Sequence, residues 1–159
     1  VLAGAGHLAN VSQPQRFTSA VLDHLAGPAG ERGEVVRRAV LGDAHVDRAA
    51  GRTTSFSLPF QRLITEYAWG GVWARPGLGR RERSVATIAM LVALGRMEEL
   101  ALHVPAALRN GLDADEIREV LLQTAIYAGV PAANTAMAVA ERALREAGVD
   151  PAGSSNDIP

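Results

Sequence analysis

Hydrophobic residues recur at intervals of three and four positions along most of this chain, which is the spacing of an amphipathic α-helix. The segment 82–94 has the widest apolar face, and we expect it to lie at the centre of the fold. No credible strand pattern occurs after residue 30, so the sequence predicts an all-α main domain. The helices are expected over residues 31–41, 43–52, 57–73, 82–94, 96–109, 114–128 and 131–147.

Glycine, proline and capping residues set the expected ends of these helices. Gly111 follows an apolar helical segment, as glycines that end helices commonly do. Asp113 and Glu116 have the spacing of a capping box and open the following helix. Pro105 removes one backbone donor, so the pattern predicts a kink or a break near 101–105.

Both ends of the chain depart from the helical pattern. Residues 1–27 combine a strand-like start, a tight turn at Gly4–His7 and one helix. Residues 149–159 are polar and predict a flexible tail. The expected organisation is an N-terminal unit over 1–27, a helical domain over 28–148 and that tail. Because the chain begins with Val1 rather than Met, we expect a processed, trimmed or fragmentary polypeptide.

The composition excludes several kinds of chemistry. All 16 basic residues are arginine, and neither lysine nor cysteine occurs among the 159 residues. Without lysine, Schiff-base catalysis and the Walker-A phosphate loop are excluded. Without cysteine, disulfides, thiol nucleophiles and cysteine zinc sites are excluded. A net charge of −1 argues against nucleic-acid binding through a basic field.

The sequence predicts neither a membrane segment nor a metal site. No apolar run approaches the ~20 residues of a membrane span, and no signal-peptide pattern is visible, so we expect a cytoplasmic protein. Asp43, His45 and Asp47 resemble metal ligands only loosely, because no established histidine or cysteine spacing accompanies them.

The strongest candidate for catalysis is the trio Arg96, Glu99 and His103. Spacings of three and four place these residues on one face of a helix. A carboxylate beside an imidazole can select its tautomer and raise its pKa, which suits a general acid. The arginine can hold a carboxylate through two hydrogen bonds. The alternative is an exposed Glu–His pair on a solvated helix face, and the neighbouring Glu98 is interpreted as a surface carboxylate.

A second candidate is the cationic start of the helix that follows the Pro76–Gly79 turn. Arg80, Arg81 and Arg83 lie in one turn, where positive charge opposes the helix dipole. Such a cluster can bind an anion or form ion pairs between subunits. We prefer the interpretation of a solvated helix face for this cluster.

Aromatic and amide side chains offer weaker candidates. Trp69 and Trp73 lie four residues apart, and we interpret them as packing residues. Tyr127 and Asn134 flank a helix-to-helix turn, where they can line a pocket or serve only capping and packing. His7 has no nucleophile, because the Gly-x-Ser-x-Gly motif of α/β-hydrolases is absent.

Two stretches of the chain carry a resemblance to known families. Six segments recur in order through the helical part, and they are 38–47, 63–70, 73–78, 89–96, 98–103 and 121–134. On these segments, residues 34–147 resemble the γ-carboxymuconolactone decarboxylase family. On Gly4–Asn10 and the helix to Leu25, residues 1–26 resemble the C-terminal end of 3-oxoadipate enol-lactone hydrolases. Some bacteria fuse these enzymes, and this chain resembles the back end of such a fusion.

The resemblance implies a fold of packed helices, an α/β-hydrolase-like remnant at the N-terminus and a homo-oligomer, expected to be a hexamer. The wider superfamily includes alkylhydroperoxidase-like proteins with a Cys-x-x-Cys-x-x-x-His motif. In this chain the histidine corresponds to His103, while Arg96 and Glu99 stand at the two cysteine positions. The resemblance therefore implies a site at the same place without the redox chemistry.

The family resemblance also implies a reaction: decarboxylation of 4-carboxymuconolactone to 3-oxoadipate enol-lactone, without a cofactor, during protocatechuate degradation. We expect His103 to deliver a proton and Glu99 to orient or charge it. Arg96 is expected to bind a carboxylate or the developing oxyanion, with Arg83 or Arg80 as a second arginine from the adjacent helix or another subunit. The alternative is a non-catalytic oligomerisation or small-molecule-binding module.

Overall fold

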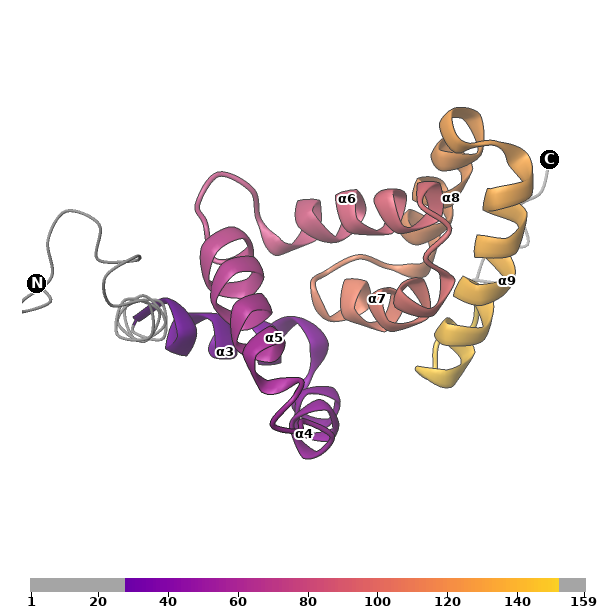
Figure 1. Ribbon diagram of the computed structural model, residues 1–159. Coiled ribbons are helices and arrows are strands. Elements are labelled where there is room, and N and C mark those ends of the chain that lie inside the picture. Colours follow the sequence, from indigo (N-terminus) through magenta and orange to yellow (C-terminus); the bar gives the residue numbers. More distant parts are fainter. Residues whose placement is uncertain (1–27, 152–159) are drawn as a thin grey trace, which may run out of the picture. The chain divides into compact units, whose positions relative to one another are not determined.

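The computed structural model describes residues 28–151, and these residues are helical without any strand. This confirms the all-α prediction for the described part of the chain. The predictions for residues 1–27 and for 152–159 lie outside it. The helices, drawn in Figure 1, are α3 (Pro28–Leu41), α4 (Asp43–Gly51), α5 (Leu58–Leu63), the π-helix η1 (Ile64–Trp73), α6 (Arg80–Ala93), α7 (Met97–Arg109), α8 (Ala114–Ala128) and α9 (Val130–Glu146).

The described residues form two compact units. One contains residues 28–37 and 47–75, and the other contains 38–46 together with the chain from 76 onward. The first unit therefore holds most of α3, α5 and η1. The second holds the α3–α4 corner and the four helices α6 to α9, which include every predicted site residue.

The core of the second unit lies where α6 packs against α7, α8 and α9. Ile88 and Val92, one turn apart on α6, are completely buried. The prediction that this helix is central is therefore confirmed. Its buried face is narrower than expected, because Val85 and Met90 are exposed. The same apolar cluster includes Leu100, Val104, Ala107, Leu112, Ile117, Leu121, Ala136, Val139, Ala140, Ala143 and Leu144.

Helix α7 continues through Pro105, so the alternative of a break near 101–105 is wrong. Proline removes one hydrogen bond from a helix interior. On both sides of it, however, Val104 and Ala107 are fully buried against the neighbouring helices. Burial of this face supports the helix across the lost bond. The sequence alone does not show this compensation, since it comes from other helices.

The predicted helix over 57–73 is confirmed as helical, but its second half is a π-helix. In η1 the backbone N–H of Ala74 donates to the carbonyl of Trp69, five residues earlier, at 3.0 Å. π-helices are rare and occur mostly as single turns, frequently at functional sites. Hydrophobic spacing did not distinguish this form from an α-helix.

The start of α3 and η1 meet backbone to backbone. A β-carbon on Gly33 would lie 2.0 Å from the carbonyl oxygen of Thr65, and one on Gly70 would lie 2.1 Å from that of Ala29. Arg32 also donates from Nε and Nη2 to the Gly70 carbonyl, at 3.2 and 3.1 Å. Only glycine permits this approach, so the two glycines determine how α3 packs on η1.

Arg37 and the two tryptophans fill the interior of the first unit. The guanidinium of Arg37 is buried and donates to Thr65 Oγ1 and to Gln61 Oε1, both at 3.2 Å. The Trp69 and Trp73 rings lie 5.2 Å apart at 35°. Trp69 is buried. These contacts confirm that the tryptophans are packing residues.

Candidate active site

The trio predicted from the sequence lies at the N-terminal half of α7. Arg96 is the residue just before the helix, with φ −88° and ψ 70°, and its carbonyl accepts from the N–H of Leu100 at 2.9 Å. Glu99 lies in the first turn, and His103 follows one turn later. Glu99 and His103 therefore share a helix face, as predicted, while Arg96 extends from the helix start.

The three side chains differ in their exposure to solvent. Arg96 and Glu99 are exposed, and within residues 28–151 neither side chain forms a hydrogen bond or an ion pair. His103 is half-buried. The guanidinium and carboxylate groups are thus available to a ligand, and the imidazole lies deeper, at the edge of the apolar core.

Burial lowers the pKa of His103 below its ordinary value of 6.5. The charge of His45 lowers it further, and the carboxylate of Glu99 acts in the opposite direction. The predicted influence of Glu99 has the expected sign, but burial outweighs it. Without a ligand, the His103 imidazole is consequently mostly neutral at pH 7. A negatively charged group near the ring would favour the imidazolium, and His103 could then act as an acid.

His45 is the residue of this site that the sequence reasoning did not assign. It lies in the first turn of α4 and is half-buried. In the sequence, His45 with Asp43 and Asp47 resembles only a weak metal-binding pattern. The described residues contain no group of three or more His, Cys, Asp or Glu that could bind a metal ion. Its effect on His103 instead identifies it as a neighbour of the candidate acid.

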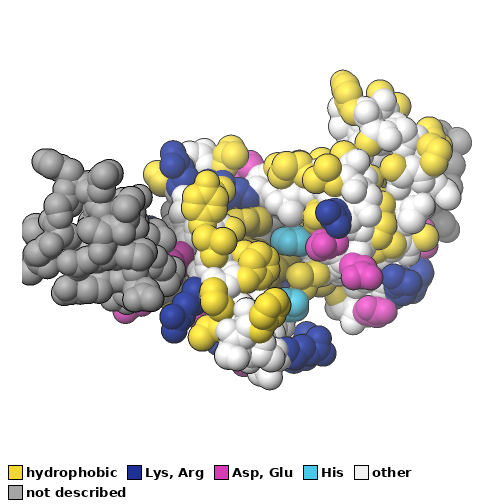
Figure 2. All heavy atoms as spheres, in the orientation of Figure 1, with side chains coloured by type: hydrophobic (Ala, Val, Ile, Leu, Met, Phe, Trp, Pro, Cys, Tyr) yellow, Lys and Arg dark blue, Asp and Glu magenta, His cyan; other side chains and the backbone are white. Residues whose placement is uncertain are grey.

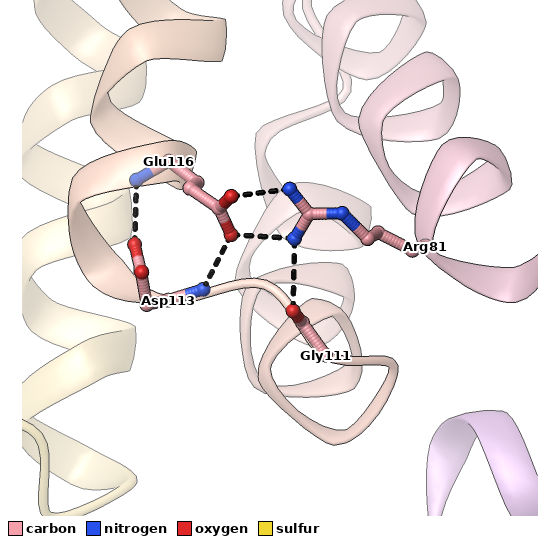
Figure 3. A network of polar contacts seen from close by, with 4 residues as sticks. All are labelled: Arg81, Gly111, Asp113 and Glu116. Atoms are coloured by element: carbon pink, nitrogen blue, oxygen red, sulfur yellow. Dashed lines mark hydrogen bonds and ion pairs between the residues drawn. The ribbon is translucent and has the colours of Figure 1, made fainter.

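Arg81, one arginine of the cluster at the start of α6, has a structural role. It donates to both carboxylate oxygens of Glu116 on α8 and, at 2.9 Å, to the carbonyl of Gly111, as Figure 3 shows. Glu116 also closes the predicted capping box with Asp113, through contacts of 2.8 and 3.1 Å. Arg81 therefore fastens α6 to the turn between α7 and α8.

Arg80 and Arg83 lie away from the start of the trio's helix. Both are in the first turn of α6, where Arg80 is exposed and Arg83 is half-buried. Arg96 follows the other end of α6, and a helix of 14 residues is about 20 Å long. Since Asn110, just after α7, donates to Ser84 Oγ at 2.9 Å, the two helices run antiparallel. Within one chain, Arg96, Glu99 and His103 therefore lie in the first half of α7 and at its start, while Arg80 lies at the opposite end of α6.

None of the helices described between residues 28 and 151 has the length and apolarity that a membrane crossing requires.

Comparison with known proteins places this helical architecture in a family. Residues 59–142, which contain α6, α7 and all the predicted site residues, match the Carboxymuconolactone decarboxylase family. A 4-carboxymuconolactone decarboxylase of Acinetobacter baylyi is 44% identical over 127 residues, which are 80% of this chain and 95% of that protein. A nitrosuccinic acid decarboxylase of Metarhizium robertsii is 40% identical over 129 residues, 81% of this chain and 90% of that protein. The chain therefore belongs to the carboxymuconolactone decarboxylase family.

Proposed function

We propose that this chain decarboxylates 4-carboxymuconolactone to 3-oxoadipate enol-lactone, a step in protocatechuate degradation. The observation that carries the proposal is the 44% identity to the Acinetobacter baylyi enzyme of that name, over 95% of its length. The exposed Arg96 supplies a positive charge for a carboxylate substrate, and the half-buried His103, whose charged form Glu99 favours, supplies a proton donor.

The substrate supplies its own electron sink in this reaction. When the bond to the carboxylate breaks, its electron pair is delocalised onto the lactone carbonyl as a dienolate. A proton then adds to carbon, so each turnover consumes one proton and releases one carbon dioxide. The protein has to position the carboxylates, stabilise the oxyanion and deliver the proton. We propose that it does so without a cofactor.

We assign the proton delivery to His103. Its pKa is lowered in the ligand-free chain, but a substrate with two carboxylates brings negative charge that favours the imidazolium. Glu99 adds to this effect from the preceding turn. The acid is therefore charged when substrate is bound and mostly neutral otherwise.

We assign the binding of one carboxylate to Arg96. Its guanidinium is exposed and stands at the start of the helix that carries the acid. A planar guanidinium binds a carboxylate through two parallel hydrogen bonds, which also fixes the orientation of the substrate.

A second arginine for the other carboxylate is proposed to come from a neighbouring copy of the chain. Arg83 and Arg80 remain the candidates, and their position at the far end of α6 favours a subunit interface over the same chain's trio. Self-association, proposed as a hexamer, is supported by exposed apolar side chains at the α8–α9 corner. Figure 2 shows hydrophobic side chains there. The large hydrophobic residues that are exposed along the end of α8 and the start of α9 are Leu122, Ile126, Tyr127 and Val130.

Decarboxylation of nitrosuccinic acid is a second candidate, because the Metarhizium robertsii relative is 40% identical over 90% of its length. A nitro group beside the scissile carboxylate can also accept the electron pair. That substrate is likewise a dicarboxylate, so Arg96 and His103 would keep the same roles. The two substrates can be compared directly with one preparation of the protein.

For residues 1–27 we propose the origin that their sequence suggests, the C-terminal end of an enol-lactone hydrolase. Such a fusion would join two consecutive reactions, since the decarboxylation product is the hydrolase substrate. His7 has no Gly-x-Ser-x-Gly partner in this chain. We therefore expect this chain to release the enol-lactone unhydrolysed, and we expect a cytoplasmic location.

To test the proposal, the purified chain is incubated with γ-carboxymuconolactone in the presence of a metal chelator, and both products are measured. Carbon dioxide and the enol-lactone should appear together in equal amounts. A parallel reaction with nitrosuccinic acid measures the competing activity as a ratio of kcat/KM values. If the folded oligomer releases no carbon dioxide from either compound, the non-catalytic module becomes the better description.

A further inference from the structure

His45 and His103 come from different segments, and Arg109 holds those segments together. Near the C-terminal end of α7, Arg109 donates from Nε to the carbonyl of Val40 at 3.2 Å and from Nη2 to that of Leu41 at 2.7 Å. These carbonyls belong to the last turn of α3. The corner after α3, which leads to His45, is thereby fixed against the helix that carries His103.

Gly42 makes this corner tight. Its φ of +85° turns the chain directly from α3 into α4, a conformation that favours glycine. A β-carbon at Gly42 would lie 3.5 Å from the guanidinium of Arg109, so the arginine is seated in the corner. His45 follows three residues later, in the first turn of α4.

The two imidazoles share one environment. Both are half-buried, and Figure 2 shows histidine on one face of the molecule, where the histidines of the described residues are His45 and His103. A charged His45 lies close enough to lower the pKa of His103, and each ring is partly open to water, so a proton can pass between them.

We propose that His45 acts through His103 as the second imidazole of a pair that shares one extra proton. The pair therefore carries a single positive charge when substrate binds. This inference rests on the proposed decarboxylase function. His103 gives its proton to the substrate carbon as the C–H bond forms. Both rings are then neutral, and His45 takes a proton from water on one ring nitrogen while it releases the proton on its other nitrogen to His103, which replaces the one proton consumed per turnover.

The charges that act on His103 come from both sides. From its own helix, the carboxylate of Glu99 favours the imidazolium, and from α4 a charged His45 opposes it. Burial, the largest cause, also opposes it. Two adjacent imidazolium ions repel each other, so the pair resists taking up a second proton until a negatively charged ligand arrives.

The test follows the titration of His103 by NMR in the full chain with isotope-labelled histidine and without substrate. His45→Gln removes the like charge, so the pKa of His103 should rise, and the alkaline limb of the kcat profile should move to higher pH. Ala44→Gln places the same side chain at the adjacent exposed position and should change neither. A purely structural role of His45 would leave the His103 titration unaltered.

Arg109→Met is the second variant, for use if His45→Gln folds poorly. Arg109→Met releases the corner from α7 and should move the pKa of His103 in the same direction as His45→Gln. If both variants are folded and His103 titrates as in the wild-type chain, the pair does not exist. A wild-type chain that shows the expected shifts but releases no carbon dioxide would retain the pair and overturn the proposed function.

Discussion

Arg81 on α6 and Glu116 on α8 face each other through two parallel hydrogen bonds, and the same carboxylate caps the start of α8 (Figure 3). The Glu116 side chain thus completes a local capping box and also joins α8 to α6, through a residue 35 positions earlier in the sequence. This geometry explains why a cluster of positive charge is tolerated at the start of α6.

The Arg81 contact predicts acid sensitivity. Together with the N–H of Asp113, it lowers the pKa of Glu116 to about 2 from an ordinary 4.5. A carboxyl whose pKa is lower in the folded state stabilises the fold above about pH 4.5, and this stabilisation is lost as the pH falls toward 2. Glu116→Gln should lower Tm at pH 7 and flatten the decline of Tm between pH 5 and 2.

The control for this prediction is Asp115→Asn on the same helix. Asp115 pairs with Arg118 at 2.8 Å, but both side chains are about half exposed and the pair lies within one helix. Such pairs contribute little to stability. Equal losses of Tm in the two variants would show that the contact between helices adds nothing beyond a surface charge.

The close approach of α3 and η1 predicts that Gly33→Ala is destabilising. The added methyl group would meet the Thr65 carbonyl at 2.0 Å, so the backbones have to separate, at a cost of about 1–3 kcal/mol. Gly51→Ala is the matched control, because nothing lies within 4 Å of its β-carbon position in α4. Urea denaturation should give a lower midpoint for Gly33→Ala and an equal or higher one for Gly51→Ala.

His103→Gln tests the assigned acid. The amide keeps much of the size and polarity of the imidazole but cannot donate a proton to carbon, so kcat should fall by ~10²–10⁴. Circular dichroism establishes that the variant is folded. Turnover within twofold of the wild-type chain would falsify the assignment.

Glu99→Gln tests the carboxylate beside that acid. Because Glu99 raises the pKa of His103, its removal should move the alkaline limb of the kcat profile to lower pH. Glu98→Gln makes the same change at the adjacent exposed position and should leave the profile unmoved. Identical profiles for the two variants would exclude an electrostatic role for Glu99.

Arg96→Lys tests the carboxylate contact. Lysine retains the positive charge but cannot form two parallel hydrogen bonds, so kcat/KM should fall by about 10–100-fold, the worth of one charged hydrogen bond. Arg142→Lys, at an exposed position of α9, is the control. Steady-state kinetics would argue against the contact if both variants kept the wild-type kcat/KM.

The sequence by itself determined the features that depend on neighbouring residues. The all-α class and the approximate limits of the helices follow from hydrophobic spacing. The cap at Asp113 and the positive φ of Gly111 need only a few consecutive residues, since their hydrogen bonds and backbone angles are local. The positions of Glu99 and His103 on one face of α7 follow from the helical repeat in the same way.

Only the tertiary structure decided the features that depend on burial and on distant segments. The continuity of α7 through Pro105 depends on neighbouring helices, and the π-helical form of η1 was not visible in the hydrophobic spacing. The lowered pKa of His103 arises because the fold half-buries its ring and brings His45, 58 positions earlier in the sequence, close to it. Charge and proton affinity at this site are properties of the packed chain, because the solvent and the charges around each group are set by residues far away in sequence.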